Sequence, residues 1–327
     1  MVYFRFPFSD QILTTNDSSN KTAVSFVSFD GLQHLDFHGE IIEISKQDFL
    51  LQKNLHQNIQ TKLCIFSPET KKDYEQKIAK VINFIKTENL SKLVISRRKL
   101  VNYEGKKPDL PQTFLNLCQS YPNAFVYLFI KDGKCWMGAF SEVLGKFDIE
   151  NSQFETMSLA GTIPIDENWT TKEVEEQQAV TDYIATILKD YSTEVQHSET
   201  LDHPSGNIKH LRTDFKAKIN REEVEQLISD LHPTPAVCGF PKEFCKNAIA
   251  DFEKDSRNFY AGYIKVETES KMHYFVNLRC AEFLKNAAFI YVGGGITADS
   301  SPEKEWFETE LKAEAILKNL SFKSIDV

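Results

Sequence analysis

Residues 260–295 read YAGYIKVETESKMHYFVNLRCAEFLKNAAFIYVGGG. This segment contains three runs rich in β-branched and aromatic residues, 260–266, 273–279 and 289–292, and that composition is typical of β-strands. The polar segment 267–271 separates the first two runs and has the composition of a turn. We therefore predict that the carboxyl-terminal third of the chain forms consecutive antiparallel strands in a simple meander.

On both sides of this segment, apolar residues recur at the spacing of amphipathic helices. The sequence predicts helices over residues 71–86, 173–189 and 222–231, a further helix that begins at Pro241, and a last helix from Ser301-Pro302 to about residue 320. The strand-like runs 125–130 and 135–140 flank an Asp-Gly pair, which is a strong signal for a β-hairpin. This mixture of helices and antiparallel strands predicts an α+β fold.

The composition excludes several classes of protein. The chain has 327 residues, of which 41% are hydrophobic and 26% charged, so it can bury a core and is not disordered. A formal net charge of -9 has the wrong sign for a nucleic-acid-binding protein, so we expect no nucleic acid as a partner. No apolar run approaches the roughly 20 residues that span a bilayer, and the amino terminus lacks the pattern of a secretory signal. We therefore expect a cytoplasmic protein with no membrane partner.

The cysteines show neither a C-x-x-C pair nor a regular spacing, so the sequence indicates no disulfide framework and no zinc site. They are Cys64, Cys118, Cys135, Cys238, Cys245 and Cys280. The histidines are equally dispersed and form no metal-binding motif. Reduced thiols are the expected state of the cysteines.

Two of the predicted helices carry carboxylates that are suited to a hard cation. On the last helix, Glu305, Glu308 and Lys312 lie on one stripe, at positions i, i+3 and i+7. The alternative is a solvated surface stripe. Glu176 lies four residues before Val180, which places its carboxylate on the inward side of its helix, unless its head reaches water from the helix edge. Carboxylates without clustered His or Cys favour Mg²⁺.

Glycines 293–295 precede the last helix but lack the order of dinucleotide-binding and Walker motifs. Such a run is suited to bring backbone N–H groups close to an anion, and a plain tight turn is the alternative. Arg279 is suited to clamp a carboxylate, although a lone strand arginine is more often a surface residue. These features indicate an enzyme that uses Mg²⁺ and acts on a small anion, and they leave the reaction open.

Five motifs occur in order along the chain: KLVISR (92–97), LAGT (159–162), LHPTPAVCG (231–239), LRCAE (278–282) and GGGI (293–296). Together they resemble the chorismate-utilising enzymes, and within them the isochorismate synthases. The resemblance covers roughly residues 71–320 and leaves 1–70 as a divergent amino-terminal part. It implies one α+β domain over 1–327, with two large antiparallel sheets packed together and flanked by helices, and the Mg²⁺-dependent conversion of chorismate to isochorismate.

The resemblance also implies two catalytic residues. Lys92 matches the general base that activates water for attack on C2 of the ring, and the alternative is an ordinary lysine at a helix-to-strand boundary. Glu142, in GAFSE at 138–142, matches the general acid that protonates the departing C4 hydroxyl. The family usually has Ser-Pro where this chain has Phe140-Ser141. A lysine base requires a lowered pKa, and a glutamic acid donor requires a raised one.

Metal ligands and substrate contacts follow from the same resemblance. The implied Mg²⁺ ligands are Glu176, Glu305 and Glu308, the carboxylates that helical spacing already singles out. Around the first of them the chain reads KEVEEQ (172–177), where relatives commonly have K-D-R-x-E-H. The implied substrate-binding residues are Gly161, Thr162, His210, Arg279, Gly295 and Lys312.

Other reactions and roles remain as alternatives. Anthranilate and aminodeoxychorismate synthases deliver ammonia, and the second tends to have P-I-K-G-T where this chain has LAGT, so both are disfavoured. Salicylate synthase shares the lysine base and the metal site but also eliminates pyruvate, and it is the runner-up. The departures at Phe140 and Val174 motivate a catalytically silent chorismate-binding protein, but the retention of Lys92 and Glu142 argues against it. We expect a monomer that serves menaquinone biosynthesis, with siderophore biosynthesis as the alternative pathway.

Overall fold

The computed structural model describes residues 1–52, 54–63, 66–205 and 208–323. These residues form two large antiparallel sheets with helices against them, which confirms the predicted α+β class. The eight-stranded sheet contains, in spatial order, β5 (Ile41–Ile44), β2 (Ile12–Thr15), β1 (Val2–Arg5), β8 (Phe125–Lys131), β9 (Lys134–Phe140), β17 (Cys280–Phe283), β18 (Ala287–Ile296) and β6 (Leu93–Asn102). The nine-stranded sheet contains β12 (Val195–His197), β14 (Ile208–Lys218), β11 (Gln153–Pro164), β10 (Val143–Asp148), β16 (Lys271–Val276), β15 (Tyr263–Glu267), β3 (Thr22–Val27) and β4 (His34–His38), with β13 (Leu201–Ser205) paired to β14. The short strands β7 (Lys107–Pro108) and β19 (Phe322–Lys323) pair separately.

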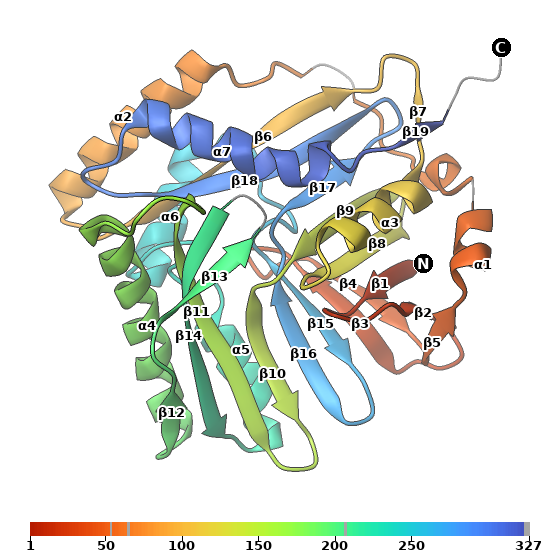
Figure 1. Ribbon diagram of the computed structural model, residues 1–327, viewed down its shortest axis with the longest axis horizontal. Helices are drawn as coiled ribbons and strands as arrows, with labels where there is room; N and C mark the ends of the chain where they lie inside the picture. The colour runs from red at the N-terminus through yellow and green to blue at the C-terminus, as the bar shows by residue number, and fades with distance from the viewer. Residues whose placement is uncertain (53, 64–65, 206–207, 324–327) are drawn as a thin grey trace.

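The α-helices of the described residues are α1 (Lys46–Leu51), α2 (Lys71–Glu88), α3 (Leu110–Ser120), α4 (Thr171–Tyr191), α5 (Val224–Leu231), α6 (Lys242–Phe252) and α7 (Pro302–Leu317). Figure 1 shows α2 and α7 lying over β6 and β18, while α4 runs along β11 and β14. Capping boxes at Thr70 and Thr170 fix the starts of α2 and α4. Ser301 takes the N-cap position of α7, as predicted, but its side chain makes no capping hydrogen bond.

The hairpin prediction is confirmed, and the meander prediction is wrong. Asp132 and Gly133 connect β8 and β9 with φ values of 52° and 74°, and two positive φ values are typical of a type I′ turn. Strands β15 and β16 do pair, but the chain then crosses to the other sheet, where β17 pairs with β9 and β18. Glycines 293–295 lie inside β18 rather than in a turn. Strand composition predicts that a strand forms but does not indicate which sheet it joins.

The two sheets pack face to face through aromatic side chains. Phe26 of the nine-stranded sheet lies over Phe129 with 4.5 Å between ring centroids, and Phe275 stacks on Phe125 at 4.4 Å. A second apolar cluster fills the opposite face of the eight-stranded sheet, beneath α3 and α7. The divergent amino-terminal part supplies strands to both sheets, because β1 pairs with β8 and β3 pairs with β15.

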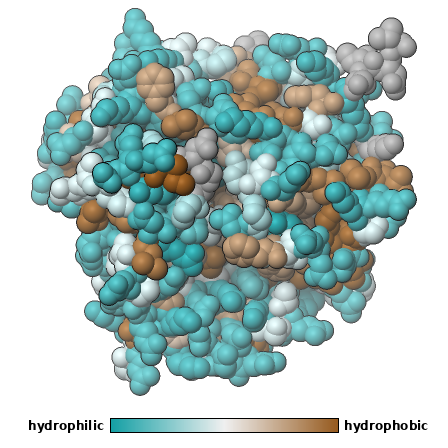
Figure 2. Space-filling model, in the orientation of Figure 1, coloured by the Kyte–Doolittle hydropathy of each residue, from teal (hydrophilic) through white to brown (hydrophobic). Residues whose placement is uncertain are grey.

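The remaining sequence predictions concern thiols and membrane spans. The cysteines of the described residues are free thiols, and Cys64 lies outside those residues. No helix in the described part of the chain has the length and apolarity that crossing a membrane requires. Figure 2 shows a surface on which hydrophilic residues predominate and apolar ones are interspersed.

Candidate active site

Two side chains of the site come from positions where the chain crosses between the sheets. The crossing from β9 to β10 contains Glu142, and the crossing from β16 to β17 contains Arg279. The two crossings are tied together, because the Val276 N–H donates to the Glu142 carbonyl and the Ala139 N–H donates to the Arg279 carbonyl, each at 3.2 Å. Arg279 has a φ of 44°, in the left-handed region that residues with a side chain rarely adopt. The hydrogen bonds hold the two crossings side by side at the pocket.

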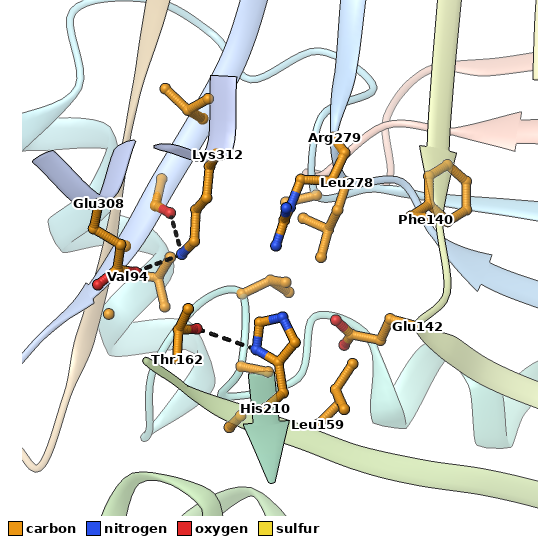
Figure 3. Close-up of a pocket in the computed structure, with 18 of the residues that line it drawn as sticks. Val94, Phe140, Glu142, Leu159, Thr162, His210, Leu278, Arg279, Glu308 and Lys312 are labelled. Carbon is orange, nitrogen blue, oxygen red and sulfur yellow. Dashed lines mark hydrogen bonds and ion pairs between the residues drawn. The ribbon is translucent and has the colours of Figure 1, made fainter. Parts of the chain in front are cut away.

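One pocket collects most of the residues that the sequence singled out. It is lined by Lys92, Glu142, Gly161, Thr162, Glu176, His210, Arg279, Gly295, Glu308 and Lys312. Figure 3 shows the Glu142 carboxyl, the His210 ring, the Arg279 guanidinium and the Lys312 ammonium around the same cavity. Arg279 is therefore not a surface residue. The structure thus brings these residues together, and their individual roles stay predictions.

Glu305 is the one predicted site residue that does not line this pocket. Its carboxylate lies next to Glu308, because a Cβ on Gly294 would be 3.1 Å from Glu305 Oε2 and 3.5 Å from Glu308 Oε1. Glu305 is 2% exposed, so the alternative of a solvated surface stripe on α7 is wrong for it. Tertiary packing of α7 on β18 buries this face of the helix.

Lys92 and Glu176 form an ion pair inside the pocket. Lys92 Nζ lies 2.5 Å from Glu176 Oε1, and the two side chains are 5% and 12% exposed. Lys92 immediately precedes β6, whose register with β18 places Val94 opposite Gly295. A Cβ on Gly295 would overlap Lys92 Cε and would lie 2.9 Å from Glu176 Oε1. Glycine at this position leaves the space that the ion pair occupies, and Lys92 is not an ordinary boundary lysine.

The Glu142 carboxyl has the electrostatic property expected of a proton donor. Burial raises the pKa of Glu142 to about 7, although the cationic Lys92, Arg279 and Lys312 act in the opposite direction. Glu142 is 7% exposed, so water does little to stabilise its charged form. A carboxyl that titrates near neutrality retains its proton in about half of the molecules at pH 7 and can transfer it.

His210 is a neutral ring with one nitrogen free to accept. Burial lowers the pKa of His210 to about 3, and the nearby charges of Arg279 and Lys312 add to this effect. Its Nδ1 lies 2.9 Å from the Gly161 carbonyl and 3.1 Å from Thr162 Oγ1. A carbonyl oxygen can only accept, so Nδ1 carries the proton and Nε2 is an acceptor. Gly161 permits this arrangement because its φ is 69°.

Lysines accompany the acidic residues around α7. Glu308 Oε1 lies 2.6 Å from Lys312 Nζ, and Glu305 Oε1 lies 3.4 Å from Lys172 Nζ. Within the described ranges, no three acidic, histidine or cysteine side chains gather closely enough to hold a metal ion. The predicted ligands are instead each paired with a lysine, and the carboxylates counterbalance the lysine charges.

One atom of this cluster nevertheless fits a cation. Glu305 Oε2 is buried and has no hydrogen-bond partner among the described residues. Burial raises the pKa of Glu305, and the charge of Glu308 raises it further. A buried oxygen without a donor is costly unless a proton or a cation satisfies it, and carboxylate oxygens are the ligands that Mg²⁺ prefers. This one oxygen therefore suits Mg²⁺, and the three-glutamate metal site stays a prediction.

The pocket also contains residues that sequence reasoning missed. They are Tyr121, Asn123, Ser141, Lys172 and Tyr260, among others. Lys172 stands four residues before Glu176 on α4, and this spacing could have indicated a charge pair. Tyr121 and Asn123 lie in the loop before β8, where no local pattern marks them.

Two departures from the family pattern have structural explanations. Val174 is 49% exposed and does not line the pocket. Gln177, where relatives commonly have histidine, is 2% exposed and donates to Ser158 Oγ at 3.0 Å and to Thr213 Oγ1 at 2.9 Å. Val174 therefore lies on the surface of α4, and Gln177 contributes to the packing of α4. Neither departure changes a side chain that lines the pocket.

Comparison with known proteins identifies the family. A family model described as chorismate binding enzyme matches residues 11–321. The chain belongs to the chorismate binding enzyme family. This family assignment agrees with the resemblance drawn from the motifs.

Several of the similar proteins are isochorismate synthases by name, and anthranilate synthase component 1 of Aquifex aeolicus is also among them. The chloroplastic isochorismate synthase of Catharanthus roseus is 41% identical over 113 residues, which cover 34% of this chain and 20% of that protein. Isochorismate synthase EntC of Escherichia coli K12 is 27% identical over 261 residues, which cover 75% of this chain and 66% of that protein. The matched part is thus less than two thirds of the length of either relative. A solved Bacillus anthracis structure, assigned as the 2,3-dihydroxybenzoate-specific isochorismate synthase DhbC, shares the fold with a TM-score of 0.79, 22% identity and coverage of 97% of this chain and 95% of that one.

Proposed function

We propose that this chorismate binding enzyme is an isochorismate synthase, an isomerase that converts chorismate to isochorismate and uses Mg²⁺. The observation that carries the proposal is the presence, in one pocket, of the Lys92 amine and of a Glu142 carboxyl whose pKa burial raises to about 7. Binding an anion requires neither a base nor an acid. The names of the similar proteins support the same reaction.

In the proposed reaction, Lys92 removes a proton from a water molecule whose oxygen bonds to C2 of the ring. The ring double bonds shift, the C4–O bond breaks, and Glu142 gives its proton to the leaving hydroxyl, which departs as water. One water molecule enters and one leaves, so the overall change is an isomerisation. Base action requires that Lys92 give up its ion pair with Glu176.

The remaining pocket residues suit a substrate with two carboxylates and a hydroxyl. Arg279 and Lys312 offer cations to the carboxylates, and His210 Nε2 offers an acceptor to a hydroxyl. Glu176, Glu305 and Glu308 would hold the Mg²⁺ ion. When bound, that ion would neutralise the ring carboxylate and withdraw electron density from the ring.

The proposal is tested by incubating the purified protein with chorismate and MgCl₂ and separating the products by chromatography. We expect isochorismate as the product. Salicylate with pyruvate would instead indicate the runner-up activity, and chorismate recovered unchanged would indicate a binding protein. We also expect treatment with EDTA to abolish turnover and added MgCl₂ to restore it, and full activity in EDTA would contradict the Mg²⁺ assignment.

Gly295→Ala is expected to lower kcat about 10- to 100-fold, because the added methyl group displaces the Lys92 amine from the pocket. Steady-state rates of isochorismate formation measure the effect. Circular dichroism and thermal melting serve as the control that the variant is folded. A folded variant with the wild-type kcat would show that the position of the Lys92 amine is not important for turnover.

A further inference from the structure

We propose that His203 is a positioning residue for Glu142. Through a hydrogen bond to Ser141, His203 holds the crossing between β9 and β10 in the conformation that points Glu142 into the pocket. This inference rests on the proposed function, in which Glu142 is the general acid.

The contact joins two segments that are far apart in the sequence. Ser141 Oγ lies 3.3 Å from His203 Nε2, and Ser141 is both a pocket residue and the neighbour of Glu142 in the chain. The backbone of this crossing is held by the Val276 N–H, which donates to the Glu142 carbonyl at 3.2 Å. Both bonds are long, so each is weak by itself. Without the His203 contact, the crossing loses the restraint on the Ser141 side chain.

His203 is itself fixed by the strand that carries another pocket residue. It lies on β13, which pairs with β14 in a register that places His203 opposite His210. Strand β14 in turn pairs with β11, whose Gly161 carbonyl accepts from His210. The His203 contact therefore connects the segment of the proposed acid to the strand pair that holds His210.

The hydrogen bond does not require a particular protonation state of His203. Burial lowers the pKa of His203 below its usual value of 6.5, Arg212 lowers it further, and Asp214 opposes them. A neutral ring can donate to or accept from a hydroxyl, and a protonated ring can still donate. The charged groups that face Glu142 are Lys92, Arg279 and Lys312, and none of them belongs to β13.

The experiment compares four single variants and one double variant of the full chain. His203→Leu and Ser141→Ala each remove the hydrogen bond, whereas His203→Gln keeps a polar group that can reach Ser141. Leu201→Ala is the matched control, because Leu201 lies on the same strand and is 61% exposed. We expect the first two variants to lower kcat about tenfold with KM changed less than about twofold, and the other two to retain the wild-type values. The double variant His203→Leu/Ser141→Ala is expected to be no worse than either single variant.

A second readout does not depend on turnover. Carboxyl ¹³C NMR measures the pKa of Glu142, and Glu142→Gln assigns the signal. We expect this pKa to fall by about one unit in His203→Leu and in Ser141→Ala, because a loosened crossing admits water. It should stay unchanged in His203→Gln. If wild-type protein does not convert chorismate, the proposed function fails, but this titration still decides whether His203 positions Glu142. The inference would be overturned if both bond-deleting variants kept the wild-type kcat and the wild-type Glu142 pKa. It would also be overturned if His203→Gln lowered kcat as much as His203→Leu does, or if the losses in the double variant were additive.

Discussion

Glu142→Gln is expected to lower kcat for isochorismate formation by about 10²- to 10⁴-fold and to leave KM nearly unchanged. Glutamine keeps the size and the polarity of the side chain, but its amide cannot transfer a proton to the leaving hydroxyl. For the wild-type enzyme, we expect kcat to fall above about pH 7, because burial raises the pKa of Glu142 to about 7 and the donor is then ionised. Initial rates across pH 5.5–9 measure both effects, and a variant that retains turnover would rule out Glu142 as the acid.

The same substitution is expected to stabilise the folded protein at alkaline pH. The Glu142 pKa rises from 4.5 to about 7 on folding, so the folded state favours the protonated carboxyl. That contribution to stability is fully present below pH 4.5 and is lost as the pH rises through 7. Glutamine does not ionise and avoids the loss, which is at most roughly 3 kcal/mol. Urea unfolding of both proteins at pH 5 and pH 8 tests this, and an equal difference at the two pH values would contradict it.

Lys92→Ala is expected to lower kcat by about 10²- to 10⁴-fold, while chorismate binding is largely kept. The amine is the group proposed to take the proton from water, whereas Arg279 and Lys312 remain in place to bind carboxylates. The rate of isochorismate formation measures the loss in kcat, and calorimetric titration with chorismate measures binding.

Two further variants sharpen the Lys92 experiment. Lys92→Met keeps most of the aliphatic side chain and should be as inactive as Lys92→Ala. Added methylamine should restore part of the activity of Lys92→Ala but not that of Lys92→Met. Because either substitution leaves Glu176 without its ion-pair partner, melting curves are needed to show that the variants are folded. A folded and active Lys92→Ala protein would remove the proposed base.

The sequence was informative where the determining interactions are local. Helical spacing indicated the inward side of α4 for Glu176, whose side chain is 12% exposed, and the Asp132-Gly133 pair between two strand-like runs predicted the hairpin between β8 and β9. The positions of Lys92 and Glu142 came from motif resemblance, because no local pattern distinguishes a pocket lysine from a boundary lysine. The structure places both of them in the pocket.

Other features could not be predicted, because they depend on which distant segments meet. After β16 the chain crosses from the nine-stranded to the eight-stranded sheet, and this crossing depends on strand pairing across the molecule. Local composition does not contain that information, so the predicted meander was wrong. Glu308 pairs with Lys312 of the same helix, which was on the predicted stripe, whereas Glu305 pairs with Lys172 of α4, which was not. The contact of His203 with Ser141 joins residues separated by 62 positions.

The aromatic packing between the sheets has a mechanical consequence. Since Glu142 belongs to a segment that leaves one sheet and enters the other, a sideways slip of either sheet would change its separation from His210. The interleaved rings of Phe26 with Phe129 and of Phe125 with Phe275 resist such a slip. The hydrophobic interior would thus maintain the separation of Glu142 and His210 on which the proposed reaction depends, so the volume of these buried phenylalanines is expected to affect a rate without any of them touching the substrate.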